Sequence, residues 1–191
     1  NFSPPLKPSH ILWINLITDS LPALALGVDP EDPSHFMHRP PRPKDENLFA
    51  AGGLSCTLLY GFLIAFISTA AFLCLPMAEL RSNGLTLSLT NLRLLLAEPQ
   101  LLTRCQTYTF TVLGISQLFH AVGMRDVETS FFRMNHLENK LMLAAFAIGI
   151  GLQVLVTEFL YFVTAFGTCR LTPGEWMQLI LLAHELLILT K

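Results

Sequence analysis

The most constraining feature of this sequence is an uncharged run between Glu46 and Glu79, in which 32 consecutive residues include no Asp, Glu, Lys or Arg. A bilayer core about 30 Å thick is crossed by about 20 helical residues, so a run of this length can span it with room to tilt. Charged residues make up 14% of the chain, against about 25% in an ordinary soluble domain. The sequence therefore predicts a membrane protein and argues against a soluble or disordered one.

Four more segments have the length and apolar character of a membrane span. We expect an all-α, polytopic transmembrane bundle of five spanning helices in one domain covering residues 1–191. The spans are predicted at about 11–28, 48–75, 105–124, 140–163 and 173–190. The chain opens with closely spaced prolines before the first span and carries no signal peptide pattern. We therefore expect it to be a piece of a longer membrane protein.

Basic residues predict which side of the membrane each loop occupies. The loops at 29–47 and 125–140, with the C-terminus, hold seven Lys and Arg, and the opposite side holds five. Cytoplasmic loops carry an excess of these residues, so the first side is predicted to be cytoplasmic. The prolines of 29–47 exclude a helix and favour an extended connector. With a net charge of −2 there is no basic field, and we expect no nucleic-acid partner.

Other patterns concern packing and the loops. Two pairs of small residues four apart, Ala145/Gly149 and Ala147/Gly151, predict close helix packing. The stretch 80–104 fits either an amphipathic interfacial helix or a loop with packed leucines. The sequence leaves open whether some of the cysteines on the non-cytoplasmic side form a disulfide, although free thiols are the simpler expectation. These cysteines are Cys74, Cys105 and Cys169.

Polar residues gather on one stripe of the first span. Asn15, Thr18 and Asp19 stand at i, i+3 and i+4, so they share one helix face. Pro22 falls on the same stripe and has no N–H, which leaves the Thr18 carbonyl without its helical donor. An amide, a hydroxyl, a carboxylate and a freed carbonyl are hard oxygen ligands that suit calcium or magnesium. The pattern predicts a metal site with a helix break at Pro22.

The carboxylate of Asp19 at mid-membrane admits two interpretations. Buried membrane carboxylates face a cavity, pair with a partner or bind an ion, because an isolated charge there is costly. Asp19 could simply bond to another helix of a non-catalytic membrane scaffold. The proline beside it favours the ion site, since backbone carbonyls freed at membrane depth are typical of transporter sites.

The same stretch, ILWINLITDSLPALALGVDPEDP, resembles the sixth transmembrane helix of calcium-transporting P-type ATPases. Their pattern is Leu-Trp-x-Asn-Leu-x-Thr-Asp-x-Leu-Pro-Ala with a Gly-x-x-Pro exit. On this resemblance Asn15, Thr18 and Asp19 fall on ion-binding positions and Pro22 on the helix break. Sodium–potassium pumps would have an acid at Asn15, and secretory-pathway calcium/manganese pumps usually have Met at Thr18. The resemblance extends over nearly the whole chain but is sharp only over residues 8–33.

The resemblance implies helices six to ten of a ten-helix, ATP-driven calcium pump. This chain would supply part of the intramembrane cation site, while ATP and magnesium would bind catalytic cytoplasmic domains absent from it. The full-length protein would be a P-type translocase, and the fragment alone would not be catalytic. Its partners would be the lipid bilayer and the remaining N-terminal part of the same pump, in a multi-pass protein of the cell membrane. The alternatives are a pump for manganese, sodium or protons, or the scaffold.

Gln117 and His120 are weaker candidates for the cation site. Two-site calcium pumps of the resembled family use a Glu on the eighth helix, but the corresponding span, 105–124, has no acid. Gln117 and His120 are polar members of that span. Either one could line the pocket, and the alternative is that they form hydrogen bonds between helices.

Overall fold

The computed structural model describes residues 3–29, 50, 52–125 and 138–189, and the side chains at positions 18, 19 and 185–189 lie outside that description. Every regular element in this part of the chain is an α-helix, so the all-α prediction is confirmed. The helices are α1 (Pro8–Gly27), α3 (Gly53–Ser82), α4 (Leu89–Leu96), α5 (Pro99–Gly123), α6 (Lys140–Glu158), α7 (Leu160–Phe166) and α8 (Pro173–Leu189). The expected connector at 29–47 lies almost wholly outside the described residues.

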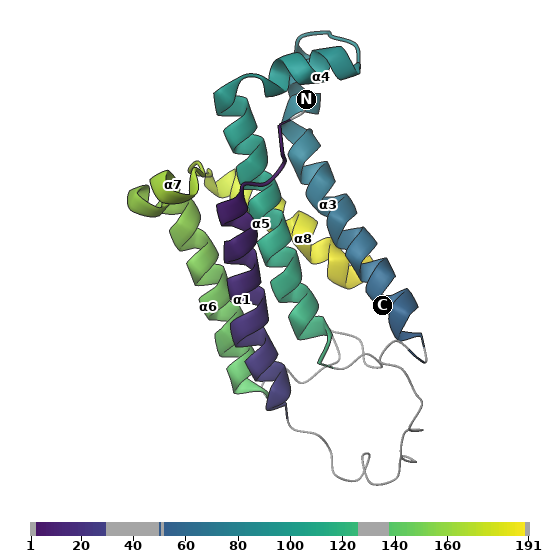
Figure 1. Cartoon of the computed structure of the whole chain (residues 1–191), viewed down its shortest axis with the longest axis vertical. Helices are drawn as coiled ribbons and strands as arrows, with labels where there is room; N and C mark the ends of the chain where they lie inside the picture. Colours follow the sequence, from purple (N-terminus) through teal and green to yellow (C-terminus); the bar gives the residue numbers. More distant parts are fainter. Residues whose placement is uncertain (1–2, 30–49, 51, 126–137, 190–191) are drawn as a thin grey trace.

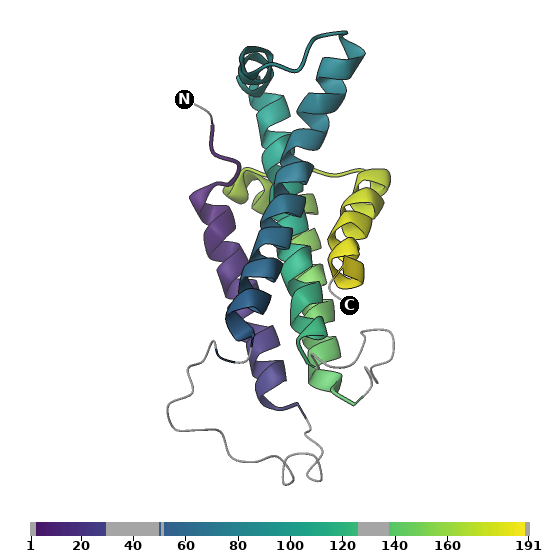
Figure 2. The ribbon, with the colours of Figure 1, turned by 90° about the vertical axis from the view of Figure 1, so that its right-hand side faces the viewer.

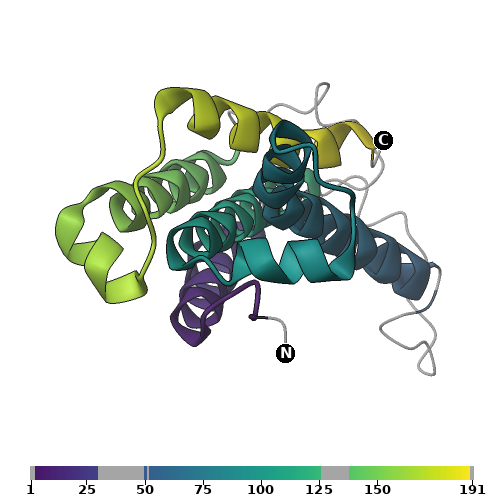
Figure 3. The same ribbon diagram turned by 90° about the horizontal axis from the view of Figure 1, so that it is seen from above.

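Helix α5 forms the core of the bundle. It packs against α1, α3, α6 and α8, which surround it when the molecule is viewed from above (Figure 3). Thirteen of its 25 residues are buried, and they include polar side chains such as Thr107 and Thr111. Helices α1, α3, α5 and α6 run along the long axis, whereas α4 lies across one end (Figures 1 and 2). Apart from Arg104 near its start, this partly polar helix carries no Asp, Glu, Lys or Arg, and it occupies the centre, where neighbouring helices cover it.

Four of the five predicted spans overlap single helices, α1, α3, α5 and α8, and the count of five membrane crossings stays a prediction. By length and composition, two helices of the described chain can cross a membrane, α3 and α6. Helix α8 has 17 residues, fewer than the 20 or so that a bilayer core requires. Helix α3 begins after Gly52, whose φ of 88° is left-handed, and it continues past the predicted end at Leu75 to Ser82. Glycine adopts that φ without steric cost, which explains the start.

The span expected over 140–163 is not one helix, which corrects the prediction. Helix α6 ends at Glu158 because Phe159 is extended, with φ −83° and ψ 122°. The Glu158 carbonyl accepts a hydrogen bond from Arg170 Nε at 3.0 Å. Its carboxylate accepts the backbone N–H of Leu171 at 3.2 Å. These contacts with the segment after α7 satisfy groups at the helix end, so the chain turns aside there.

Both interpretations of the stretch 80–104 hold in part. Helix α4 covers eight of these residues, and Ser88 caps it by accepting the Asn91 N–H at 3.1 Å. Leu96 is buried in a cluster with Phe72 of α3. Leu89, by contrast, is 70% exposed. The segment is therefore a short amphipathic helix whose inner leucines pack on the bundle end.

One of the two predicted small-residue pairs makes a close helix contact. Ala145 is 2% exposed, and a Cβ on Gly149 would lie 2.7 Å from a methyl group of Leu118 on α5. The second pair makes no such contact among the described residues, because Ala147 is exposed there and a Cβ on Gly151 would meet none of them within 4 Å. The pattern alone cannot tell which side of a uniformly apolar helix meets its neighbour.

Gly149→Val should lower the stability of the fold by about 2 kcal/mol, because overpacking a filled helix contact costs about that much. Leu118, which would have to move, is itself 2% exposed. The check is thermal unfolding of the full-length protein in detergent. Gly151→Val on the same helix is the matched control and should stay within about 0.5 kcal/mol of the parent. Equal effects from the two variants would contradict the α5–α6 contact.

Candidate functional site

Helix α1 buries one face and leaves Asn15 on the other. Ile14 and Ile17 are 3% and 5% exposed, and α1 packs against α5 and α6. Leu12 and Leu16 are 72% and 61% exposed, and Asn15 is exposed beside them. The first of the predicted ligands therefore stands on a face that the described helices leave uncovered.

Thr18 and Asp19 follow Asn15 on the same helix, three and four positions later. Their side chains lie outside the described part of the structure, so the predicted grouping of the three ligands stays a prediction. Among the residues that the structure describes, no group of three or more His, Cys, Asp or Glu side chains can hold a metal. Calcium takes six to eight oxygen ligands, so three side chains of one helix would form only part of a site.

Pro22 does not interrupt α1, and the predicted helix break is corrected in that sense. The helix runs from Pro8 to Gly27 with Pro22 inside it, and the proline is buried. The fixed φ of proline is compatible with an α-helix, and what it removes is one N–H donor. The chain thus stays helical, and the consequence of Pro22 is a carbonyl at Thr18 without its usual donor.

The N-terminal end of α1 is attached to the end of α7. The Nζ of Lys7 donates to the Gly167 carbonyl at 2.6 Å. His10 is fully buried, and its Nε2 lies 3.0 Å from the Phe166 carbonyl. Its ring stacks on Phe110 of α5 with centroids 4.4 Å apart. Carbonyls at a helix end lack helical partners, so these two side chains satisfy them and fix α1.

A largely buried ion pair between Arg125 and Asp29, with side chains 7% and 18% exposed, holds the opposite end of α1. Arg125 Nε donates to both carboxylate oxygens of Asp29, at 3.1 and 3.0 Å. Asn139 Nδ2 donates to Asp29 Oδ1 at 2.7 Å and to the Ala25 carbonyl at 2.8 Å. Asn139 also caps α6 by accepting the Met142 N–H. Sequence reasoning missed this group. The available signal was that each of its three polar residues stands where an apolar run begins or ends.

A second polar group attaches α8 to the bundle. Glu175 accepts hydrogen bonds from Arg104 and from the Tyr108 hydroxyl, both on α5. The neighbouring indole, Trp176 Nε1, donates to the Glu158 carboxylate at 2.8 Å. Glu158 at the end of α6 and Glu175 in the first turn of α8 are thus both bonded to side chains of other helices.

The two weaker candidates have different surroundings. Gln117 lines a cavity of about 620 Å³ between α3, α5 and the N-terminal segment. Its Oε1 and the Ser68 hydroxyl are buried and have no hydrogen-bond partner among the described residues. His120 instead packs its ring against Tyr60 of α3, with centroids 4.4 Å apart. Among the residues that line this open cavity is Gln117, and Asn15 is not one of them.

The cysteines, all within the described residues, are free thiols, as the simpler expectation had it. Cys105 is fully buried and Cys74 is exposed. Burial raises the pKa of the Cys169 thiol in the loop before α8. A thiol with a raised pKa is mostly protonated and therefore a poor nucleophile near neutral pH.

Comparison with known proteins matches nearly the whole chain. The family described as "Cation transporting ATPase, C-terminus" matches residues 3–191. The chain is 37% identical to "Calcium-transporting ATPase 1" of Bacillus cereus over 182 residues, which is 94% of this chain and 20% of that protein. It is 33% identical to "Calcium-transporting ATPase" of Bacillus subtilis, over 92% of this chain and 17% of that protein. It is 29% identical to "Calcium-transporting ATPase type 2C member 1" of Mus musculus, over 100% of this chain and 18% of that protein.

Proposed function

This chain belongs to the family of cation-transporting ATPase C-termini, and from that we propose that it forms part of the membrane domain of an ATP-driven calcium pump. It spans about a fifth of the length of the curated relatives it matches, so the activity is that of a longer protein. ATP and magnesium would bind outside this chain. The pump would be a multi-pass protein of the cell membrane, with five spans in this part.

The proposal assigns the cation site to α1. Asp19 would be the charged ligand, and Asn15 and Thr18 would be neutral oxygen donors. The observation that carries the proposal is the position of Asn15 on the uncovered face of a helix attached at both ends. A helix fixed at its ends can present ligands in a constant geometry, while helices outside this chain would supply the remaining oxygens.

ATP-dependent uptake of radioactive calcium into vesicles holding the full-length protein tests the function. We expect calcium to stimulate ATP hydrolysis and to accumulate inside the vesicles. Manganese, sodium and a proton gradient are assayed in parallel, and a preference for one of them would replace calcium in the proposal. Full transport by Asp19→Ala would instead support a structural role for that carboxylate.

The number of ions follows from the number of charges. Two calcium ions within a few ångströms repel strongly in a low dielectric, so a second ion needs more negative charge. Asp19 is the one acid within the proposed site on this chain, and the span 105–124 has none. We predict one calcium per phosphorylation site. Equilibrium binding of radioactive calcium to the purified full-length pump measures the ratio, and saturation near two would contradict the prediction.

Pro22→Ala should weaken calcium binding without unfolding the protein. The alanine N–H would restore the helical bond to the Thr18 carbonyl, which would then be less available to an ion. Because α1 is already helical through Pro22, the substitution requires no change of backbone conformation. The measurement is the calcium concentration for half-maximal ATP hydrolysis, beside thermal unfolding. Unchanged calcium dependence would show that Pro22 matters only for packing.

A further inference from the structure

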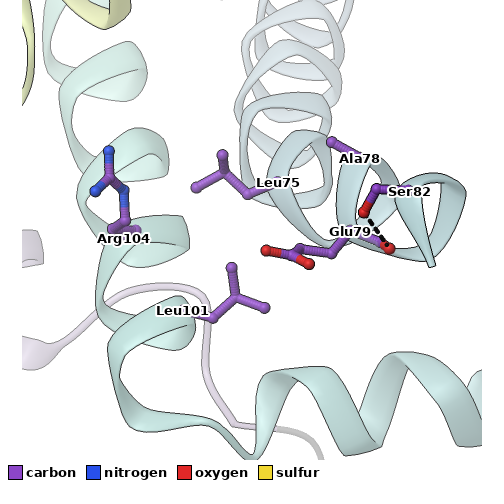
Figure 4. A pocket seen from close by; sticks show the side chains of 6 residues that line it. All are labelled: Leu75, Ala78, Glu79, Ser82, Leu101 and Arg104. Carbon is purple, nitrogen blue, oxygen red and sulfur yellow. Dashed lines mark hydrogen bonds between the residues drawn. The ribbon is translucent and has the colours of Figure 1, made fainter.

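A second cleft lies between α3 and α5, away from the Gln117 cavity, with a volume of about 450 Å³. Its lining combines an apolar wall with three polar side chains (Figure 4). The apolar residues are Leu75, Ala78 and Leu101, and the polar ones are Glu79, Ser82 and Arg104. The Ser82 hydroxyl donates to the Glu79 backbone carbonyl at 3.0 Å, which leaves the two opposite charges as the groups able to select a ligand.

The two charges stand at the same edge of the apolar layer. Glu79 is the first charged residue after the uncharged run 47–78, and Arg104 is the last before 105–124. The helices that carry them pack directly against each other. The first charged residues beyond the apolar parts of two neighbouring spans mark the boundary between the hydrocarbon of a bilayer and its headgroups. The cleft therefore opens at the depth of phospholipid headgroups, on the predicted non-cytoplasmic side.

Each charge keeps capacity for a ligand. The Glu79 carboxylate reaches toward α5 between Leu75 and Leu101 (Figure 4) and accepts a long hydrogen bond, 3.4 Å, from Asn83 Nδ2. Arg104 donates to Glu175, and a guanidinium has five N–H donors, so further ones remain. Its guanidinium points away from the Glu79 carboxylate in the same view. A ligand that satisfies both must carry a cation and an anion some distance apart.

We propose that this cleft binds the headgroup of a phosphatidylethanolamine-type phospholipid, with its ammonium at Glu79 and its phosphate at Arg104. An ammonium has N–H groups that can donate to a carboxylate, which a choline headgroup lacks. Phosphatidylglycerol carries the same phosphate but a neutral glycerol in place of the ammonium, so the Glu79 carboxylate would face a negative lipid without a cationic partner. The acyl chains would follow the apolar surface of Leu75 and Ala78, which belong to the uncharged run 47–78 and lie on the bilayer side of Glu79.

Native mass spectrometry of the full-length protein in detergent tests the site. Dioleoyl phosphatidylethanolamine, phosphatidylcholine and phosphatidylglycerol are titrated separately, and glycerophosphoethanolamine serves as the headgroup without chains. We expect the ethanolamine lipid to bind at least about fivefold more tightly than the other two, as the loss of a charge-assisted hydrogen bond would predict. Glu79→Gln should remove that preference. Glu98→Gln, an exposed glutamate just before α5, should keep it.

The outcomes separate the proposal from its rivals. A preference for ethanolamine lipid that persists in Glu79→Gln would overturn the site, and so would equal binding of phosphatidylglycerol to the parent protein. If glycerophosphoethanolamine competes as strongly as the whole lipid, the acyl chains do not contribute to binding. That result would overturn the proposal of a lipid site and indicate a soluble ligand. Thermal unfolding in phosphatidylcholine checks that Glu79→Gln is folded. Calcium uptake in phosphatidylcholine vesicles tests the pump function independently of this cleft.

Discussion

Asp19→Asn is expected to abolish high-affinity calcium binding by the full-length pump. The substitution keeps the size of the side chain and removes its charge, so any packing role is largely preserved. A divalent ion in a low-dielectric site depends strongly on each carboxylate ligand, and we expect the affinity to fall at least about a hundredfold. The measurement is equilibrium binding of radioactive calcium, together with the calcium dependence of ATP hydrolysis.

Glu98→Gln is the control for Asp19→Asn, because it removes one carboxylate at an exposed position outside the proposed site. It should bind calcium as the parent does. Thermal unfolding of both variants shows whether they are folded. Calcium binding by a folded Asp19→Asn protein within about threefold of the parent, far from the loss that a removed ligand implies, would exclude Asp19 as a ligand. The scaffold interpretation of that residue would then stand.

Arg125→Ala is expected to destabilise the bundle more than any surface substitution. The Arg125 and Asp29 side chains are only 7% and 18% exposed. Removing one partner of a buried pair leaves the other charge uncompensated, at a cost of about 3 kcal/mol. The C-terminal end of α1 would lose its ion pair to the residue after α5, and keep its bonds to Asn139 and its packing on Val122. Thermal unfolding of the full-length protein measures the loss.

Two further variants show whether that loss comes from the pair. Asp29→Asn combined with Arg125→Met removes both charges together and should recover most of the stability, because no buried charge is left alone. Arg81→Ala makes the same kind of truncation at an exposed position of α3 and should have an effect below about 0.5 kcal/mol. A double variant as unstable as Arg125→Ala would contradict the mechanism.

Much of the secondary structure followed from the positions of the charges. A helix in an apolar solvent satisfies its own backbone, so a long uncharged run has few alternatives to helix. The uncharged run at 105–124 accordingly appears within α5, and the apolar stretch predicted at 173–190, which includes Glu175 and Glu185, appears as α8. The predicted span 140–163 is interrupted at Phe159. The hydrogen bonds to Glu158 at the end of α6 come from Arg170 and Leu171, which follow α7. No local pattern contains those partners.

The candidate site likewise combines features that follow from local sequence with features that depend on distant contacts. The order Asn15, Thr18, Asp19 and Pro22 is a property of one helix, so the sequence alone places these residues on one stripe. The ends of α1 are held by partners far along the chain. Lys7 bonds to Gly167, 160 positions away.

The sequence by itself determined that this protein is helical and apolar and that α1 carries an oxygen-rich stripe. Helical periodicity and the cost of charge in a bilayer depend on residues close together in the chain, so the sequence shows them without the tertiary structure. Only the tertiary structure decided that, of the described helices, a neighbour meets Gly149 and not Gly151, and that Glu79 and Arg104 line one cleft. In a helix that is apolar all round, hydrophobicity does not mark the buried side. The side that packs is chosen by the shapes of the helices that surround it.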